Sequence, residues 1–407
     1  MDAKGSLENE STLCRFAAAT GRADDVLLFT LNPSFVGATY NPLYMAKGVD
    51  PRGVAERVFS TFEPEMSEPY YRDMARELFV NLVIALASTG KQMCMLDILA
   101  CVSDVRILLH ALEQASDAAA VWRIKNRVTK LGDKFDHTFS SLVALLSQYD
   151  HPAVNAYSPD IVLERDLESG CIVGFSLPAN AYKFLARSIG LIVFQHLQQV
   201  GAMRQMRRGP HVPISVFADE FYTFAYEGFI DAVNKLRDAD ISLLLSHQSL
   251  SDLERVSPEF ARGIWDNTRN KILLYANDSE LCERIAQSVG TRRDVELTVR
   301  RAADSYLNQV SMLEASSREV DEFILHPNQL KNLKVGQAYL VQAGVGGDEI
   351  HKRSWWRRRK PSDSVRAVGT HLPLLPALPD VERPSYESQG EEVGLGLYDR
   401  FIRGAES

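Results

Sequence analysis

Apolar residues are spaced in two different ways along the chain, and each spacing predicts a different kind of structure. After residue 161, apolar runs such as Ile214–Ala218 and Ile241–Ser246 alternate with helix-like stretches. The runs recur about every 25–30 residues, which is typical of parallel strands joined by helices. We therefore expect an α/β domain with a doubly wound, mostly parallel sheet, to which the early strand Val26–Thr30 also belongs.

A segment between the two α/β stretches shows no strand signal. Through Tyr71–Leu86, Leu96–Ala115 and Phe135–Leu146, apolar positions recur every three or four residues, which is the spacing of amphipathic helices. The change of pattern predicts an all-α domain inserted into the α/β domain. The expected division is residues 1–62 and 156–350 for the α/β domain, 63–155 for the all-α domain, and 351–407 for a basic segment and a largely disordered tail.

The other expected elements have bounds that the structure can test. An early helix is expected at Thr12–Gly21. The further strands are Cys171–Leu177 and Lys271–Tyr275, and the further helices are Ala179–Val200, Tyr222–Ala239, Ser251–Trp265 and Ser279–Val289. A turn that contains Arg204 follows the first of these further helices, and Val393–Ile402 in the tail predicts a short helix that docks on a partner.

The composition restricts the possible functions. The chain has 407 residues and a formal net charge of −8. Such a protein does not coat nucleic acid over its whole surface, although a local basic channel remains compatible with this charge. Five cysteines without Cys-x-x-Cys spacing predict free thiols in a reducing cytoplasm. No apolar run approaches the roughly 20 residues of a membrane span, so we expect a soluble chain.

The strongest chemical signal is a strand that ends in two adjacent carboxylates. Ile214–Ala218 is followed by Asp219 and Glu220, and parallel sheets bind ligands at the C-terminal edge of their strands. In this Walker B arrangement, the first carboxylate helps to hold Mg²⁺ at the nucleotide phosphates and the second acts as general base on water. Asp219 is the expected ligand of Mg²⁺–ATP, although a solvated Asp-Glu turn would have the same sequence.

Two further polar residues accompany this strand. Gln248 follows the next strand, where it would sense the γ-phosphate or position the water, or else simply begin a helix. Arg237 closes the helix between the two strands. Ring-forming motors often place an arginine there to reach the nucleotide of the neighbouring subunit, whereas an ordinary surface arginine is also favoured at a helix C-terminus by the dipole.

In order and spacing, these residues resemble conjugative coupling ATPases of the TraD/TraG type, the coupling proteins of type IV secretion systems. The matching motifs are Asp2–Gly5, Tyr40–Leu43, Asp219-Glu220, Arg237, Gln248, Asn267–Tyr275, Ile285–Thr291, Ser316–Phe323 and Leu333–Leu340. In the family the first is an Asp-x-Lys-Gly strand end and the second an Asn-Pro-Leu loop. The resemblance therefore covers residues 1–343.

The resemblance implies a RecA-like motor that binds ATP and Mg²⁺ and works as a homohexameric ring. Such motors lie at the cytoplasmic face of the bacterial inner membrane, beneath the channel components. They couple ATP hydrolysis to export of single-stranded DNA or protein. The family uses its all-α domain to meet the relaxosome or an effector protein. The implied catalytic set is Asp219, Glu220, Gln248 and Arg237.

One motif of the family is missing from the sequence. No Gly-x-x-x-x-Gly-Lys-Ser/Thr loop occurs in it, although this P-loop supplies the amide cradle and the lysine for the β- and γ-phosphates. In the family the loop precedes the Asp-x-Lys-Gly strand, so we expect it, the first strand of the sheet and the membrane anchor upstream of Met1. On this interpretation the chain is truncated before the Walker A loop, through a true truncation or a mis-assigned start, or else its front half comes from another chain. In each case we expect it to be inactive alone.

Basic residues outside the nucleotide motifs are further candidates for DNA contact. The turn after residue 200 would line the ring channel, or form an ordinary surface loop, with Arg204, Arg207 and Arg208. Phosphate contact combined with base stacking suits single-stranded DNA. The segment His351–Lys360 has this composition, or is a solvated linker, with Trp355, Trp356, Arg357 and Arg358.

Three functions remain open on the sequence. The first is the coupling ATPase of a conjugation or type IV secretion system. The second is an FtsK- or HerA-like DNA pump, which the inserted helical segment and the Asn-Pro-Leu loop disfavour. The third is a non-catalytic remnant that only docks substrate through its helical domain.

Overall fold

Short apolar strands in the first half of the chain pair in parallel, as the sequence predicts. The structure, a computed structural model, describes residues 1–33, 35–207, 211–303, 310–335, 337–341, 351–355 and 394–403. Two parallel pairs are formed by β1 (Val26–Thr30) with β2 (Ile172–Ser176) and by β3 (Ile214–Ala218) with β4 (Ile241–Leu245). Asp2 lies between the pairs and bridges Ser176 and Asp219 in parallel. The order is thus β1, β2, the N-terminal residues, β3 and β4.

Helices cover both faces of the β1–β2 pair. On one face, Leu28 packs in a cluster with Cys14 of α1 (Leu7–Ala19). On the other, Phe29 contacts Tyr40 with ring centroids 6.4 Å apart, and the Tyr40 hydroxyl contacts His196 of the long helix α9 (Lys183–Met206). Because successive strand residues point to opposite faces, this part of the chain has the three layers of a doubly wound α/β domain.

The β3–β4 pair has a buried face and an exposed face. Ile214 and Ile241 are buried, and Ile241 lies beside Gly201 of α9 (Lys183–Met206). The residues that point the other way include Phe217 and Leu244, which are register partners and are 61% and 49% exposed. Among the described residues, no helix is packed over these two side chains.

A block of helices stands beside the sheet in the same compact unit. Its helices are α2 (Pro51–Phe59), α3 (Pro69–Ala87), α4 (Met95–Ser103), α5 (Val105–Ala111), α6 (Ala118–Leu131) and α7 (Phe135–Ser147). The buried rings of Phe62, Phe79 and Tyr149 form its aromatic core. Phe62 stacks on Phe184 in the first turn of α9, and α9 begins shortly after the C-terminal end of β2. The block therefore adjoins that edge of the sheet.

Several connecting elements complete the first unit. The remaining α-helices there are α8 (Leu163–Glu168), α10 (Phe229–Arg237), α11 (Leu250–Glu254), α12 (Pro258–Asn267), which runs past the boundary of the unit, and α15 (Leu397–Phe401). The 3-10 turns are η1 (Ala23–Asp25), η2 (Glu63–Glu65), η3 (Leu112–Gln114), η4 (Gly132–Lys134), η5 (Pro152–Val154) and η6 (Phe221–Phe224). Among the helices that the structure describes, none is long and apolar enough to cross a membrane.

Four predicted helices have wrong bounds. The early helix expected at Thr12–Gly21 is α1, which runs from Leu7 to Ala19. α9 begins at Lys183 rather than Ala179 and runs on to Met206, since the residues after Val200 are good helix formers with a single glycine among them. The expected helix Tyr222–Ala239 is divided between η6 and α10. The expected helix Ser251–Trp265 is divided between α11 and α12, because Pro258 has no N–H to continue a helix.

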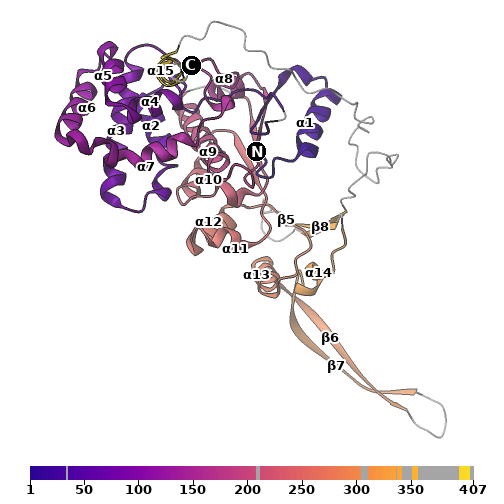
Figure 1. The fold of residues 1–407 in the computed structure, drawn as a ribbon. Coiled ribbons are helices and arrows are strands. Elements are labelled where there is room, and N and C mark those ends of the chain that lie inside the picture. Colours follow the sequence, from indigo (N-terminus) through magenta and orange to yellow (C-terminus); the bar gives the residue numbers. More distant parts are fainter. Residues whose placement is uncertain are drawn as a thin grey trace. The chain divides into compact units, whose positions relative to one another are not determined.

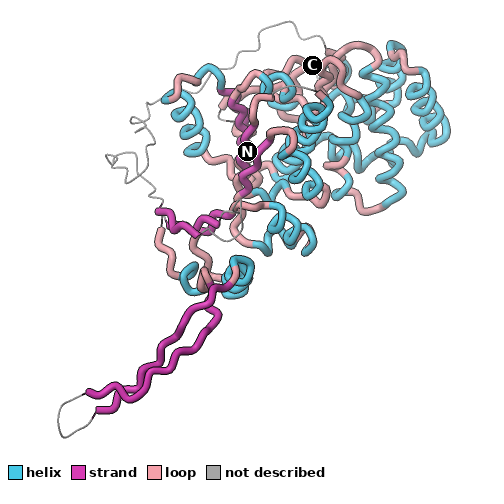
Figure 2. The backbone as a smooth tube through the Cα atoms, turned by 180° about the vertical axis from the view of Figure 1, so that it is seen from behind, coloured by secondary structure: helices cyan, strands magenta, loops and turns pink. Residues whose placement is uncertain are grey.

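The second unit lies within Ala261–Thr370 and has an antiparallel sheet. Its elements are β5 (Lys271–Leu273), α13 (Ser279–Val289), β6 (Thr291–Ala303), β7 (Val310–Phe323), α14 (Pro327–Lys331), β8 (Gln337–Val341) and β9 (His351–Trp355). Cys282, Ile285 and Leu330 are buried together in its core. β6 and β7 form the long two-stranded ribbon in Figure 2.

Two expectations about organisation differ from the structure. β5 was expected as a further parallel strand, but it pairs antiparallel with β8. The helical block and the parallel sheet form one compact unit, and the boundary between units falls at Phe260. The four-segment division of the chain stays a prediction, and the tail expected to be disordered lies mostly outside the described residues.

Candidate functional site

Asp219 and Glu220 lie where the sequence predicts, directly after β3 and at the sheet edge where β3 and β4 both end. The strand β3 ends at Ala218, and the Asp219 N–H donates to the Met1 carbonyl at 2.9 Å. One oxygen of Asp219, Oδ1, accepts hydrogen bonds from the Ser246 hydroxyl at 2.5 Å and from the Glu220 N–H at 3.1 Å. Ser246 directly follows β4. The two strand ends are therefore joined through the Asp219 side chain.

Glu220 is held by groups from two other parts of the unit. Its Oε1 accepts a hydrogen bond from Gln248 Nε2 at 3.1 Å and lies 2.9 Å from Lys4 Nζ. The Glu220 side chain is 14% exposed, whereas that of Lys4 is 52% exposed. The structure thus brings Asp219, Glu220 and Gln248 to one edge of the sheet.

The backbone of Glu220 is left-handed, with φ 50° and ψ 48°. A residue with a Cβ loses about 1–2 kcal/mol in this conformation, and such strain is typical of functional sites. The neighbouring Phe221 N–H donates to the Ser246 carbonyl, and the Phe221 ring is fully buried. Anchoring of the following residue holds the Glu220 backbone in place and directs its carboxylate toward Lys4 and Gln248.

The charges at this edge form a small mixed cluster. The hydrogen bond with Glu220, together with the charge of that carboxylate, raises the pKa of Lys4. Lys4 is therefore a cation at neutral pH and compensates one of the two carboxylates. Sequence reasoning did not name Lys4 or Ser246 as site residues, although Lys4 lies in the Asp-x-Lys-Gly motif.

The arrangement fits a magnesium ion that is held partly by a nucleotide. Within the described residues, no three or more His, Cys, Asp or Glu side chains gather around one point, and the second oxygen of Asp219 has no recorded hydrogen-bond donor. Mg²⁺ usually keeps several waters and takes one or two carboxylates plus substrate phosphates. Asp219 is the side chain placed to supply that carboxylate.

Arg237 does not join this cluster. It is the exposed last residue of α10, which precedes β4, so it lies at the N-terminal edge of the strands. Asp219 and Gln248 follow the opposite ends of β3 and β4, which run parallel. A role for Arg237 at the nucleotide of its own chain is thus not supported by its position.

The residues predicted to contact DNA lie in different environments. Arg204 lies inside α9 rather than in a turn and is 2% exposed, paired with Glu168 at 2.8 Å. Its guanidinium also donates to the Ala239 carbonyl, so this arginine is not available to line a channel. Arg207 is exposed just after α9. Trp355 ends β9, and the other candidates lie outside the described residues, namely Arg208, Trp356, Arg357 and Arg358.

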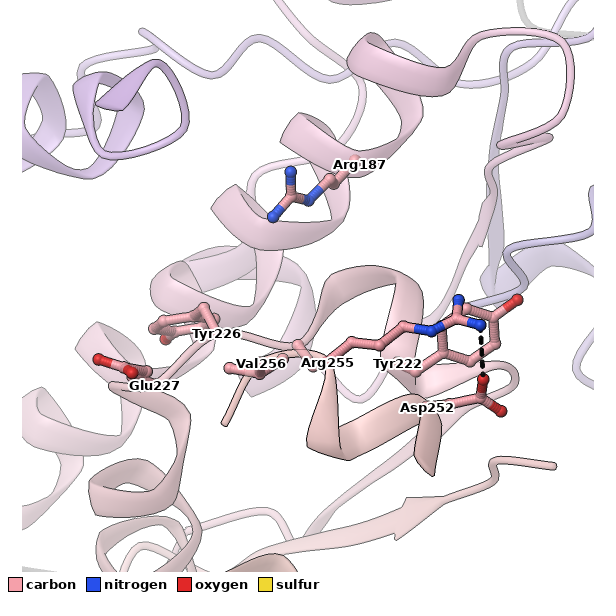
Figure 3. A pocket seen from close by; sticks show the side chains of 8 residues that line it. Arg187, Tyr222, Tyr226, Glu227, Asp252, Arg255 and Val256 are labelled. Atoms are coloured by element: carbon pink, nitrogen blue, oxygen red, sulfur yellow. Dashed lines mark ion pairs between the residues drawn. The ribbon is translucent and has the colours of Figure 1, made fainter. Parts of the chain in front are cut away.

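An open cavity of about 390 Å³ is lined by residues of α9, of η6 and the loop after it, and of α11 and the residues after it (Figure 3). It is lined by Arg187, Tyr222, Ala225, Tyr226, Glu227, Asp252, Arg255 and Val256. Tyr222 follows Glu220 by two residues, and Arg255 lies 3.8 Å from Asp252. The cavity therefore combines two arginines with two tyrosines.

Sequence and structure comparisons relate the chain to conjugation proteins. Residues 213–335 match the sequence model of a family described as the TraM recognition site of TraD and TraG. This span begins just before β3 and includes the carboxylates and most of the second unit. A search of curated proteins finds no match.

Solved structures of one bacterial conjugative coupling protein share the fold. The unbound form of TrwBdeltaN70 has a TM-score of 0.54 at 17% identity, covering 83% of this chain and 75% of that one. TrwB with a non-hydrolysable ATP analogue has a TM-score of 0.56 at 15% identity, covering 85% and 77%. TrwB with ADP and Mg²⁺ has a TM-score of 0.53 at 16% identity, with the same coverage. The fold is therefore the RecA-like α/β fold of these structures.

Proposed function

We propose that this chain, a conjugative coupling protein of the TraD/TraG type, supplies the carboxylate edge of a Mg²⁺–ATP site that drives export of single-stranded DNA or protein. The observation that carries the proposal is the joined cluster of Asp219, Glu220 and Gln248 at the ends of two parallel strands. P-loop motors place the metal-binding and water-activating carboxylates at this edge. The TrwB structures with nucleotide support ATP and Mg²⁺ as the ligands.

Each residue of the cluster has a separate role in this proposal. Asp219 holds Mg²⁺, directly or through water, with the oxygen that Ser246 and the backbone leave open. Glu220 accepts a proton from the attacking water. Gln248, hydrogen-bonded to Glu220, orients that water or contacts the γ-phosphate. Mg²⁺ held by Asp219 would supply positive charge to offset the negative charge that develops on the phosphates.

Lys4 positions the general base before nucleotide binds. Its ammonium pairs with the Glu220 carboxylate at 2.9 Å and, with Gln248, fixes the direction in which that carboxylate points. Because half of the Lys4 side chain is exposed, the pair can separate when phosphates and metal enter. Lys4 is then free to turn toward the phosphate oxygens.

Arg237 is proposed to act on the nucleotide of a neighbouring subunit in a homohexameric ring. Its exposed position, away from the carboxylate edge of its own chain, supports a target in another subunit. The match of residues 213–335 to a TraM recognition site supports a relaxosome-type partner for this region. We place the assembled protein at the inner face of the bacterial inner membrane, under the channel components.

The test is ATP turnover by a protein in which these 407 residues are preceded by a phosphate-binding loop. Glu220→Gln keeps the shape but removes the base, so turnover should fall about 10²–10⁴-fold while nucleotide binding is retained. Glu259→Gln, at an exposed residue of α12, is the matched control and should keep the parent rate. Equal rates for Glu220→Gln and the parent would remove Glu220 from the chemistry.

The same assay separates the proposed role of Arg237. Arg237→Ala should bind nucleotide normally at every concentration. Its rate should fail to rise when increasing protein concentration assembles the parent into rings. A rate that rises with concentration as in the parent would rule out action on a neighbouring subunit.

A further inference from the structure

The end of the chain returns to the helical block and lies against α4 and α5 (Figure 1). The sequence predicts a short helix that docks on a partner, whereas α15 packs within its own compact unit. Contact begins at Gly394, which makes a parallel β-bridge with Gln92. The next residue, Leu395, donates its N–H to the Gln92 carbonyl at 3.1 Å. We call residues 394–403 the tail segment.

A buried carboxylate of α4 is shared between its own helix and the tail segment. Asp97 is 0% exposed, and its Oδ2 accepts the Cys94 N–H at 3.0 Å. Its other oxygen, Oδ1, accepts the Leu397 N–H at 2.8 Å and the Tyr157 hydroxyl at 3.1 Å. One oxygen thus caps α4, and the other binds the backbone of the tail segment.

Tyr157 extends this recognition by one residue. Its hydroxyl oxygen accepts the Gly396 N–H at 2.8 Å while its proton is donated to Asp97. Two consecutive backbone N–H groups of the tail segment therefore donate hydrogen bonds to two side chains of the block, and these two side chains are hydrogen-bonded to each other. Hydrogen bonds to charged or polarised acceptors are stronger than neutral ones. Burial raises the pKa of Asp97, so filling its acceptor positions with donors stabilises the ionised form.

The site also selects the sequence of the tail segment. A Cβ at Gly394 would lie 2.2 Å from the Tyr157 ring, so only glycine allows this approach. Gly396 has φ +59°, which disfavours side chains with a Cβ. Leu397 is 5% exposed and fills an apolar position against α4. The helical block therefore recognises the pattern Gly-x-Gly-Leu through the close approach at Gly394, the left-handed backbone at Gly396 and the burial of Leu397.

Contacts at the far end of the tail segment are peripheral. The Phe401 ring meets His110 of α5 edge-on, with centroids 5.6 Å apart. Arg403 lies 3.5 Å from Asp150, and both side chains are about half exposed. Only Leu397 of the tail segment is buried. Because only one apolar side chain of the tail segment is buried, we expect the tail segment to detach from the block and rebind readily.

We propose that the surface formed by α4, α5 and Tyr157 is a peptide-recognition site of the helical block, with the tail segment of the same chain as its built-in ligand. The tail segment acts as a latch, because any protein that uses this face of the block must first displace it. The latch does not depend on the nucleotide chemistry proposed above. Its failure and that of the ATP site are therefore distinguishable.

The test measures binding of a fluorescent peptide with the sequence of residues 392–405. A chain that ends at residue 390 should bind it, whereas the intact chain should bind it at least about tenfold more weakly, because the attached tail competes at high local concentration. The full-length variant Leu397→Asp releases the tail without shortening the chain. It should bind the peptide as the shortened chain does. Agreement between the two shows that peptide binding does not result from misfolding of the shortened chain.

Matched peptides test the recognition itself by fluorescence anisotropy on the shortened chain. The peptide with Gly394→Ala should bind at least about tenfold more weakly because of the clash with Tyr157. The peptide with Arg400→Ala is the control and should keep the parent affinity within about twofold, since Arg400 is exposed. In the shortened chain, Tyr157→Phe should lower affinity for the parent peptide while leaving the melting temperature unchanged.

Three results would overturn the proposal. The first is absence of peptide binding by both the shortened chain and Leu397→Asp. The second is equal binding by the intact and shortened chains, or indifference to Gly394→Ala. The third is a concentration-dependent dimer of the intact chain that Leu397→Asp abolishes, because the tail segment would then lie on a second copy.

Discussion

The left-handed backbone at Glu220 predicts an inverted ranking of glycine and alanine at that position. At ordinary helix positions alanine is favoured over glycine by about 0.5–1 kcal/mol. At φ 50° and ψ 48°, glycine escapes the strain of a Cβ, so the ranking should reverse. The perturbation is therefore the pair Glu220→Gly and Glu220→Ala, compared with the same pair at Lys125, an exposed residue within α6.

The magnitude follows from terms that differ between the two variants. Both lose the hydrogen bond from Gln248 and the pair with Lys4, so these losses cancel in the comparison. Alanine keeps the left-handed strain of about 1–2 kcal/mol, whereas glycine loses about 0.5–1 kcal/mol through the greater entropy of its unfolded chain. Glu220→Gly should thus be more stable than Glu220→Ala by about 0.5–1 kcal/mol. At Lys125 the difference should be similar in size and opposite in sign.

The four variants are unfolded in urea, and circular dichroism follows the loss of structure. Their free energies of unfolding are compared using one common slope of free energy against urea concentration. Neither Glu220 variant retains the general base, so in the protein with a phosphate-binding loop both should turn over ATP about 10²–10⁴-fold more slowly than the parent. If Glu220→Ala proves more stable than Glu220→Gly, the anchored left-handed backbone is not a strained feature of the site, and the account of its geometry is refuted.

Three further predictions concern buried charge and packing in the first unit. Glu168→Ala should destabilise the protein by about 1–3 kcal/mol in urea unfolding, because it leaves the buried Arg204 guanidinium uncompensated, and Arg204→Met should recover much of that loss when combined with it. Burial, with the nearby charge of Arg57, lowers the pKa of His196 in the folded protein. The unfolded chain therefore takes up the proton first, so stability should fall as pH drops below about 6.5, and this dependence should weaken in His196→Gln. Gly190→Ala should destabilise by about 1–3 kcal/mol in thermal unfolding, since its Cβ would lie 2.1 Å from the Phe224 ring.

The strands were predictable because their apolar runs end at polar residues. Val26–Thr30 and Ile214–Ala218 have the predicted bounds, and the parallel register of β3 and β4 brings Asp219 beside Ser246. The direction of β5 was not predictable in this way. It has three residues, and an apolar run of that length carries no information on whether its partner runs parallel or antiparallel.

The residues that sequence reasoning missed or misplaced depend on contacts between distant segments of the chain. Lys4 reaches Glu220 because Asp2 enters the sheet between β2 and β3, which no local pattern reveals. Arg204 was misplaced because the helix-forming residues after Val200 extend α9 by more than a turn. The position of the tail segment depends on the buried carboxylate of Asp97 in a helix far away in sequence.

The role of Asp219 in metal binding is tested by the affinity for Mn²⁺ together with ATP, measured by electron paramagnetic resonance on a protein in which these 407 residues follow a phosphate-binding loop. Asp219→Asn keeps the size of the side chain and the acceptor for Ser246 but removes the charge that holds the metal. It should weaken metal binding by about 10–100-fold, while the control Glu259→Gln binds as the parent does. Parent-like affinity in Asp219→Asn would contradict the assignment of this strand edge as the metal–nucleotide site.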